Sequence, residues 1–144
     1  MNISFTLDQQ EVIDSNDPVG NMTITDGKTI LTVESTYLDS WFDVLIDGLQ
    51  GLNKKDKLTL EIVEEPEMII FENTLPGLKI TYGKEELFFK KNYFYQELLN
   101  SVREFLFQLN QNEKDLTSLP IVRKLRNFIE QSSIKQDQKP KALT

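Results

Sequence analysis

The sequence contains neither cysteine nor histidine. Without cysteine there are no disulfides, no thiol nucleophile and no zinc site built on thiolates. Without histidine the chain lacks the commonest general base and the commonest metal ligand, and nucleophile–histidine pairs are excluded. These two absences remove most familiar catalytic centres, so we expect no enzyme activity and no cofactor.

Long hydrophobic runs are also missing from the sequence. No apolar stretch approaches the roughly 18 residues that a membrane helix needs, and the first residues, MNISFTLDQQ, lack the basic and apolar regions of a signal peptide. The six glycines are scattered and form no phosphate-binding loop. These features predict a cytoplasmic protein that does not bind membranes.

The composition is that of a globular protein. Of the 144 residues, 39% are hydrophobic and 27% are charged, which suits one domain with a real core. We expect a single domain over residues 1–132. The polar segment 133–144, SIKQDQKPKALT, predicts a disordered tail.

The net charge of −7 is unevenly distributed. Residues 1–90 hold 17 acids and 7 bases, a charge of −10, whereas residues 91–144 hold 6 acids and 9 bases, a charge of +3. An acidic body repels nucleic acid and attracts basic proteins, although solubility alone would also explain the charge. The small basic group Arg123, Lys124 and Arg126 is interpreted as a solvated helix face whose cations partly complement the acidic body.

Alternating residues and turn signals predict seven strands. Ile3, Phe5 and Leu7 alternate with polar residues, and NMTITDGKTILTVE is typical of a hairpin with a type I′ turn at Asp26–Gly27. KLTLEIVEEPEMIIFEN predicts strands at 57–64 and 67–73, and GLKITYGKEELFFKK predicts a further pair. Short links between the last four strands favour an antiparallel meander.

Three segments have helical periodicity. YLDSWFDVLIDGLQGL, residues 37–52, predicts an amphipathic helix capped by Ser35 or Thr36. Gly48 and Gly51 in this segment favour a helix cap over a close backbone approach. Residues 92–112 predict a second helix, and a shorter one follows with Pro120 in its first turn. The order βββ-α-ββββ-αα indicates an α+β fold, an antiparallel sheet covered by helices on one face.

Two acidic groups are candidate partner-binding sites. Asp39, Asp43 and Asp47 recur every four residues, and like charges at that spacing weaken a helix by a few tenths of a kcal/mol per pair. They form a solvated face or a surface for lysine and arginine. A metal site is less favoured, because three carboxylates on one helix side do not converge.

The second acidic group is the turn VEEPE, which contains Glu64, Glu65 and Glu67. Acids at a hairpin tip are often only solvated, but they also protrude and suit contact with a partner. A carboxylate-based, metal-dependent enzyme is a weaker alternative, because an acidic surface is a poor host for phosphate substrates.

The whole profile, small, acidic and α+β without histidine or cysteine, resembles the immunity proteins of bacterial polymorphic-toxin and contact-dependent-inhibition systems. The resemblance implies a tight complex with a cognate toxin domain, often a basic nuclease, whose active site the acidic residues would cover. An acidic secretion chaperone or adaptor is the alternative. It is less favoured because such chaperones usually open with a helix, and this chain opens with a predicted strand.

Overall fold

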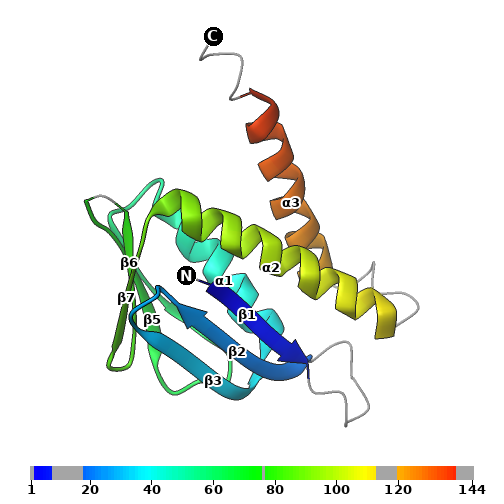
Figure 1. The fold of residues 1–144 in the computed structure, drawn as a ribbon, viewed down its shortest axis with the longest axis horizontal. Helices are drawn as coiled ribbons and strands as arrows, with labels where there is room; N and C mark the ends of the chain where they lie inside the picture. The colour runs from blue at the N-terminus through cyan, green and yellow to red at the C-terminus, as the bar shows by residue number, and fades with distance from the viewer. Residues whose placement is uncertain (1, 8–17, 76, 113–119, 139–144) are drawn as a thin grey trace.

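The structure is a computed structural model that describes residues 2–7, 18–75, 77–112 and 120–138. Within these residues the elements follow the order βββ-α-ββββ-αα, which confirms the predicted α+β class (Figure 1). The elements are β1 (Asn2–Leu7), β2 (Val19–Thr25), β3 (Ile30–Tyr37), α1 (Leu38–Gly51), β4 (Lys57–Glu61), β5 (Met68–Asn73), β6 (Leu78–Tyr82), β7 (Glu85–Phe89), α2 (Lys91–Asn112) and α3 (Pro120–Gln138).

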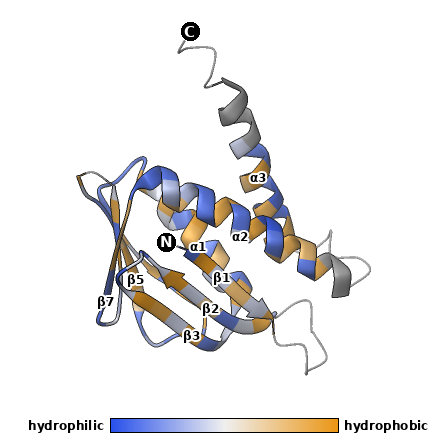
Figure 2. Cartoon of the chain, viewed as in Figure 1, coloured by the Kyte–Doolittle hydropathy of each residue, from blue (hydrophilic) through white to orange (hydrophobic). Residues whose placement is uncertain are grey.

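The strands form two antiparallel sheets, where the sequence predicted one. β1–β3 form an N-terminal sheet and β4–β7 a C-terminal sheet, each with its strands in sequence order, so the predicted four-strand meander is confirmed. Apolar and polar residues are interspersed along these strands (Figure 2). Most of the apolar ones are buried or half-buried, whereas Ile30, Met68 and Phe88 are exposed. Alternation identifies a strand and its buried face. It does not say which strands pair, and here α1 carries the chain from one sheet to the other.

The β2–β3 connection is not the type I′ turn that we predicted. Such a turn needs positive φ at both central residues, and Gly27 has a φ of 97° while Asp26 is not in that region. Thr25 pairs with Ile30, which leaves a longer loop. Asp26 Oδ1 organises it by accepting the backbone N–H groups of Lys28 and Thr29 at 2.9 and 2.8 Å.

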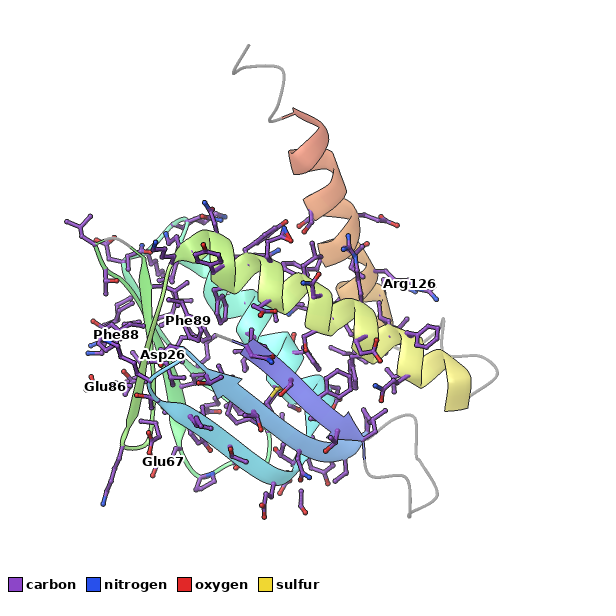
Figure 3. The ribbon with its side chains drawn as sticks, in the orientation of Figure 1. Asp26, Glu67, Glu86, Phe88, Phe89 and Arg126 are labelled. Carbon is purple, nitrogen blue, oxygen red and sulfur yellow. The ribbon has the colours of Figure 1, made fainter. Side chains whose placement is uncertain are left out.

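Asp26 also joins the two sheets. Its Oδ2 accepts the backbone N–H of Phe88 on β7 at 2.9 Å, and Figure 3 shows the two residues together where the hairpin tip meets the C-terminal sheet. Burial raises the pKa of Asp26, but the backbone N–H groups of Thr29, Phe88 and Lys28 together lower it below its usual value. The charged carboxylate is therefore the form that the fold favours.

α1 lies at the centre of the core. Its predicted apolar face is buried: Leu38, Trp41, Phe42, Leu45, Ile46, Leu49 and Leu52. The predicted cap is wrong, because the N-cap is Tyr37 and no side chain caps it. The first helical N–H, that of Leu38, instead donates to the carbonyl of Pro18 at 2.9 Å. The oxygen of Thr36 is used elsewhere.

The glycines of α1 allow close approach and do not cap the helix, which corrects our interpretation. A Cβ placed on Gly48 would lie 2.3 Å from the ring of Phe71 on β5, and one on Gly51 would lie 2.4 Å from Leu58 on β4. The C-cap is instead Leu52, which has right-handed helical angles. The face of α1 that carries Gly48 and Gly51, which we call the glycine face, therefore packs on the C-terminal sheet.

α2 and α3 complete the layer of helices. Phe42 of α1 and Phe105 of α2 stack at 4.7 Å between ring centroids, and α3 buries Val122, Leu125 and Phe128. In Figure 1, the C-terminal part of α3 projects beyond the rest of the fold. α3 continues to Gln138, six residues past the predicted domain boundary at 132, and residues 139–144 of the predicted tail lie outside the described residues.

Candidate protein-binding surface

The acidic stripe of α1 faces a lysine of the same chain. The side chain of Lys124 on α3 forms ion pairs with Asp43 and with Asp47, the latter at 2.6 Å between Nζ and Oδ1. Burial lowers the pKa of Lys124, but the hydrogen bonds and charges of the two aspartates outweigh it and raise that pKa. Asp43 and Asp47 therefore have a basic neighbour within the same chain, where one cation bridges two repelling carboxylates.

The first member of the stripe lies apart from this bridge. Asp39 sits half-buried in the first turn of α1, where the helix dipole stabilises an anion. Its position is explained by the helix itself. Lys124 confirms the interpretation of the α3 cations as complements to the acidic body, whereas Arg123 and Arg126 remain exposed.

Glu65 is the central residue of a hydrogen-bond network. Its carboxylate accepts the hydroxyl of Thr36 at 2.6 Å and the hydroxyl of Tyr82 at 3.2 Å. Thr36 Oγ1 in turn accepts the indole N–H of Trp41 at 2.9 Å. Glu65 thus connects the end of β3, the first turns of α1 and the end of β6.

The network changes the acidity of Tyr82. Burial, the charge of Glu65 and the hydrogen bond to Glu65 raise the pKa of Tyr82 to about 12, and Glu67 adds a smaller contribution. Of these two acids, Glu65 is the one that accepts the hydrogen bond of the phenol. Of the predicted acidic turn, Glu65 therefore supports the fold and is half-buried, whereas Glu64 and Glu67 are exposed.

The exposed acids occupy a turn with constrained geometry, which we call the acidic turn (residues 62–67). Glu64 has a φ of 66°, an uncommon value for a residue with a side chain. The N–H of Glu65 donates to the carbonyl of Ile62 at 3.1 Å, and Ile62 is buried. Figure 3 shows Glu67 at the end of the C-terminal sheet away from α2. The turn is thus held to the fold through Ile62 and Glu65, while Glu64 and Glu67 are exposed to solvent.

Two apolar side chains accompany these acids. Val63 is 61% exposed and Met68, the first residue of β5, is 45% exposed. Elsewhere on the surface, the aromatic residues Tyr93 and Phe107 on α2 are exposed, and Tyr37 and Tyr95 are half-buried. The acidic turn therefore combines charge with apolar surface, a composition suited to contact with a protein.

The six predicted site residues do not form one site. Asp43 and Asp47 bind Lys124, and Glu65 binds Thr36 and Tyr82. Of the other three, Asp39 is half-buried in the first turn of α1, and Glu64 and Glu67 face solvent. Within the described ranges, no group of three or more acidic side chains is arranged to hold a metal ion. In the same ranges, no helix is long and apolar enough to cross a membrane.

Sequence reasoning missed the role of Asp26, which it read only as a turn residue. Its contact with Phe88 spans 62 residues, so no local signal reveals it. Comparisons with protein-family models, with curated protein sequences and with solved structures give no match to this chain.

Proposed function

We propose that this protein is a non-catalytic protein-binding module whose contact surface is the acidic turn, and that its partner is a basic protein. This proposal rests on one observation, which is that the acids of the turn have different environments. Glu65 is held by Thr36 and Tyr82, while its neighbours Glu64 and Glu67 project into solvent. A surface already ordered before binding loses little conformational entropy when a partner arrives.

The strained backbone supports the same proposal. A residue with a side chain at a φ of 66° costs roughly 1 kcal/mol or more, and such strain persists where the surrounding structure enforces it, often at binding sites. Glycine would relieve the strain at position 64, but the sequence has glutamate there. The turn thus carries an acid at a position where the backbone favours another residue.

The partner class follows from the surface chemistry. Glu64 and Glu67 would steer a basic protein into contact, and Val63 and Met68 would supply the apolar area that gives an interface its affinity. A basic toxin domain fits this surface, so we propose that the protein acts as an immunity protein that neutralises such a toxin by direct binding.

The test is capture of the partner from the native host with charge-reversed baits. We expect the unaltered protein to retain one basic protein in stoichiometric amount. We expect the double variant Glu64→Lys, Glu67→Lys to bind that protein at least about tenfold more weakly, since close charge pairs across interfaces contribute more than 1.4 kcal/mol. The same variant should fail to protect cells that express the captured protein.

The matched control carries the same charge change elsewhere. Glu34 on β3 and Glu130 on α3 are both exposed, so the variant Glu34→Lys, Glu130→Lys has the same net charge as the test variant. Equal binding by the test variant and the unaltered protein would contradict the proposal, as would a stoichiometric partner that is acidic. Weakening by both variants alike would assign the effect to net charge.

A further inference from the structure

A cavity of about 400 Å³ lies between α1 and α3. Ile46 and Phe128 form its apolar floor, and most of the other lining side chains are polar or charged. Ile46 of α1 and Phe128 of α3 are almost fully buried, and the ring of Phe128 packs edge-on against Tyr95 of α2 at 5.7 Å between centroids. A volume of this size falls within the range of small-molecule sites, roughly 300–1,000 Å³.

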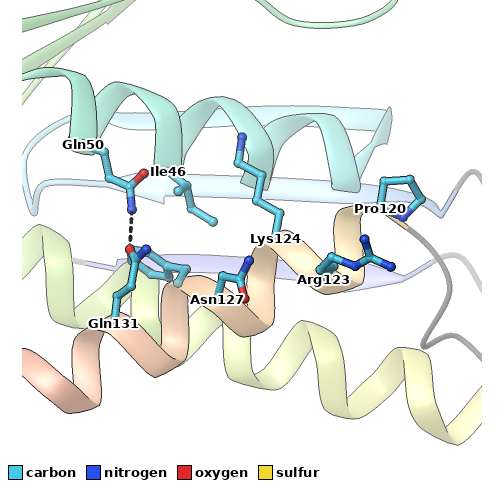
Figure 4. A pocket seen from close by; sticks show the side chains of 8 residues that line it. Ile46, Gln50, Pro120, Arg123, Lys124, Asn127 and Gln131 are labelled. Carbon is cyan, nitrogen blue, oxygen red and sulfur yellow. Dashed lines mark hydrogen bonds between the residues drawn. The ribbon is translucent and has the colours of Figure 1, made fainter.

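The walls of the cavity carry amides from both helices. Gln50 Nε2 of α1 donates to Gln131 Oε1 of α3 at 3.3 Å, and this hydrogen bond closes one end of the cavity (Figure 4). Asn127 lies one turn before Gln131 on the same helix and also lines the cavity. These side chains present both donors and acceptors above an apolar floor.

Two cations border the cavity, and they differ in how they are compensated. Lys124 extends towards α1, where Asp43 and Asp47 bind it. Arg123 lies beside Pro120 at the end opposite the Gln50–Gln131 bond, and it forms no ion pair with any of the residues that the structure describes. The cavity therefore has one uncompensated guanidinium at its mouth.

From this arrangement we propose that the cavity binds a small organic carboxylate with a single ring or short apolar body. Arg123 would hold the carboxylate through paired N–H···O bonds, a geometry that guanidinium provides and ammonium does not. The apolar body would lie over the small part of Phe128 and Ile46 that reaches the cavity, and Asn127 would bind a polar substituent. This site lies on a different part of the molecule from the acidic turn and does not depend on the proposed function.

The structure offers a matched pair of arginines for the test. Arg126 is exposed on the same helix, three residues after Arg123, and is not one of the residues that line the cavity. Figure 3 shows its side chain extending outward from α3. Substitutions Arg123→Gln and Arg126→Gln remove the same charge from the same helix. Only the first removes a group that borders the cavity.

Binding is measured by titrating ¹⁵N-labelled protein with 3-phenylpropionate, indole-3-acetate and hexanoate, and with 3-phenylpropanamide as the uncharged control. We expect at least one carboxylate to shift the side-chain amide signals of Gln50, Asn127 and Gln131. Its dissociation constant should rise at least about tenfold in Arg123→Gln, the effect of losing a charge-assisted bond pair, and stay nearly unchanged in Arg126→Gln.

Three results would overturn this proposal. The first is that none of the three carboxylates shifts these signals up to its solubility limit. The second is that the amide binds as tightly as the carboxylate, and the third is that Arg123→Gln binds like the unaltered protein. The amide spectrum of each variant also reports whether it is folded, so a loss of structure is distinguished from a loss of the site.

Discussion

At the scale of single residues, Gly48 determines how closely α1 approaches the C-terminal sheet. A Cβ at this position would lie 2.3 Å from the fully buried ring of Phe71. Helix propensity alone predicts that Gly48→Ala stabilises the protein by about 1 kcal/mol. We expect the opposite, a loss of about 1–3 kcal/mol in unfolding free energy, because the packed ring cannot move aside. Urea denaturation measures the difference.

Gly51→Ala is the matched control. The Cβ there would meet the end of the Leu58 side chain, which is flexible and only half-buried. We expect this variant to be neutral or more stable. Stabilisation by both substitutions would show that the two helix positions differ little and that the contact with Phe71 is unimportant.

Asp26 gives the stability a dependence on pH. Its pKa is lower in the folded protein than the ordinary value of 3.8, so its contribution is present above that value and is lost as the pH falls through the folded pKa. Asp26→Asn leaves the N–H of Phe88 without its carboxylate acceptor. We expect a loss of about 1 kcal/mol at pH 7 that shrinks below pH 4, measured by denaturation across that range. A loss that does not vary with pH would contradict this role.

At the scale of elements, the ion pairs of Lys124 attach α3 to α1. The three side chains are between 32% and 47% exposed, so the contribution is that of a partly screened surface interaction. We expect Lys124→Met, which keeps most of the aliphatic stem, to lower the unfolding free energy by about 0.5–1 kcal/mol at low salt. It should also speed hydrogen exchange in α3.

The salt dependence separates the ion pairs from the loss of packing. The difference between Lys124→Met and the unaltered protein should shrink at high ionic strength, since salt screens exposed charges. Arg126→Met, at an exposed position of the same helix, serves as the control. If high salt leaves the difference unchanged, the aspartates do not hold α3 through charge.

The elements themselves were largely predictable, because each depends on its own periodicity. The contacts between the elements were not predictable. The contact between Lys124 and Asp43 spans 81 residues and that between Thr36 and Glu65 spans 29. The spacing of the aspartates left a solvated face and a surface for lysine and arginine both open, because a periodic pattern does not reveal that Lys124 of the same chain lies beside Asp43 and Asp47. Thr36 was predicted as a helix cap for the same reason, because the sequence pattern does not reveal its distant partner Glu65.

At the scale of the whole molecule, Glu65 holds both sheets and α1 together through Thr36 and Tyr82. The raised pKa of Tyr82, about 12 against an ordinary 10, means that its contribution is present below pH 10 and is lost as the pH rises towards 12. We expect the unfolding free energy to fall in this interval, and to fall less steeply in Tyr82→Phe. Glu65→Gln should shift the phenol titration, followed by ultraviolet absorbance, back towards pH 10.

Lysine side chains also titrate at alkaline pH. The contribution of the phenol is therefore obtained from the difference between Tyr82→Phe and the unaltered protein. Equal slopes in Tyr82→Phe and the unaltered protein would show that the phenol is not linked to stability. An unchanged phenol titration in Glu65→Gln would show that the carboxylate does not control it.

The separation of the two sheets along the chain also has a consequence for the order of folding. Each sheet is a meander of neighbouring strands, so its contacts are local and form without closing a long loop. During synthesis, the N-terminal sheet and α1 are complete before β4 emerges. The glycine face of α1 then stays uncovered until Phe71 arrives. We expect a chain shortened to its first 56 residues to expose this face and to associate, and the longer chain to bury it.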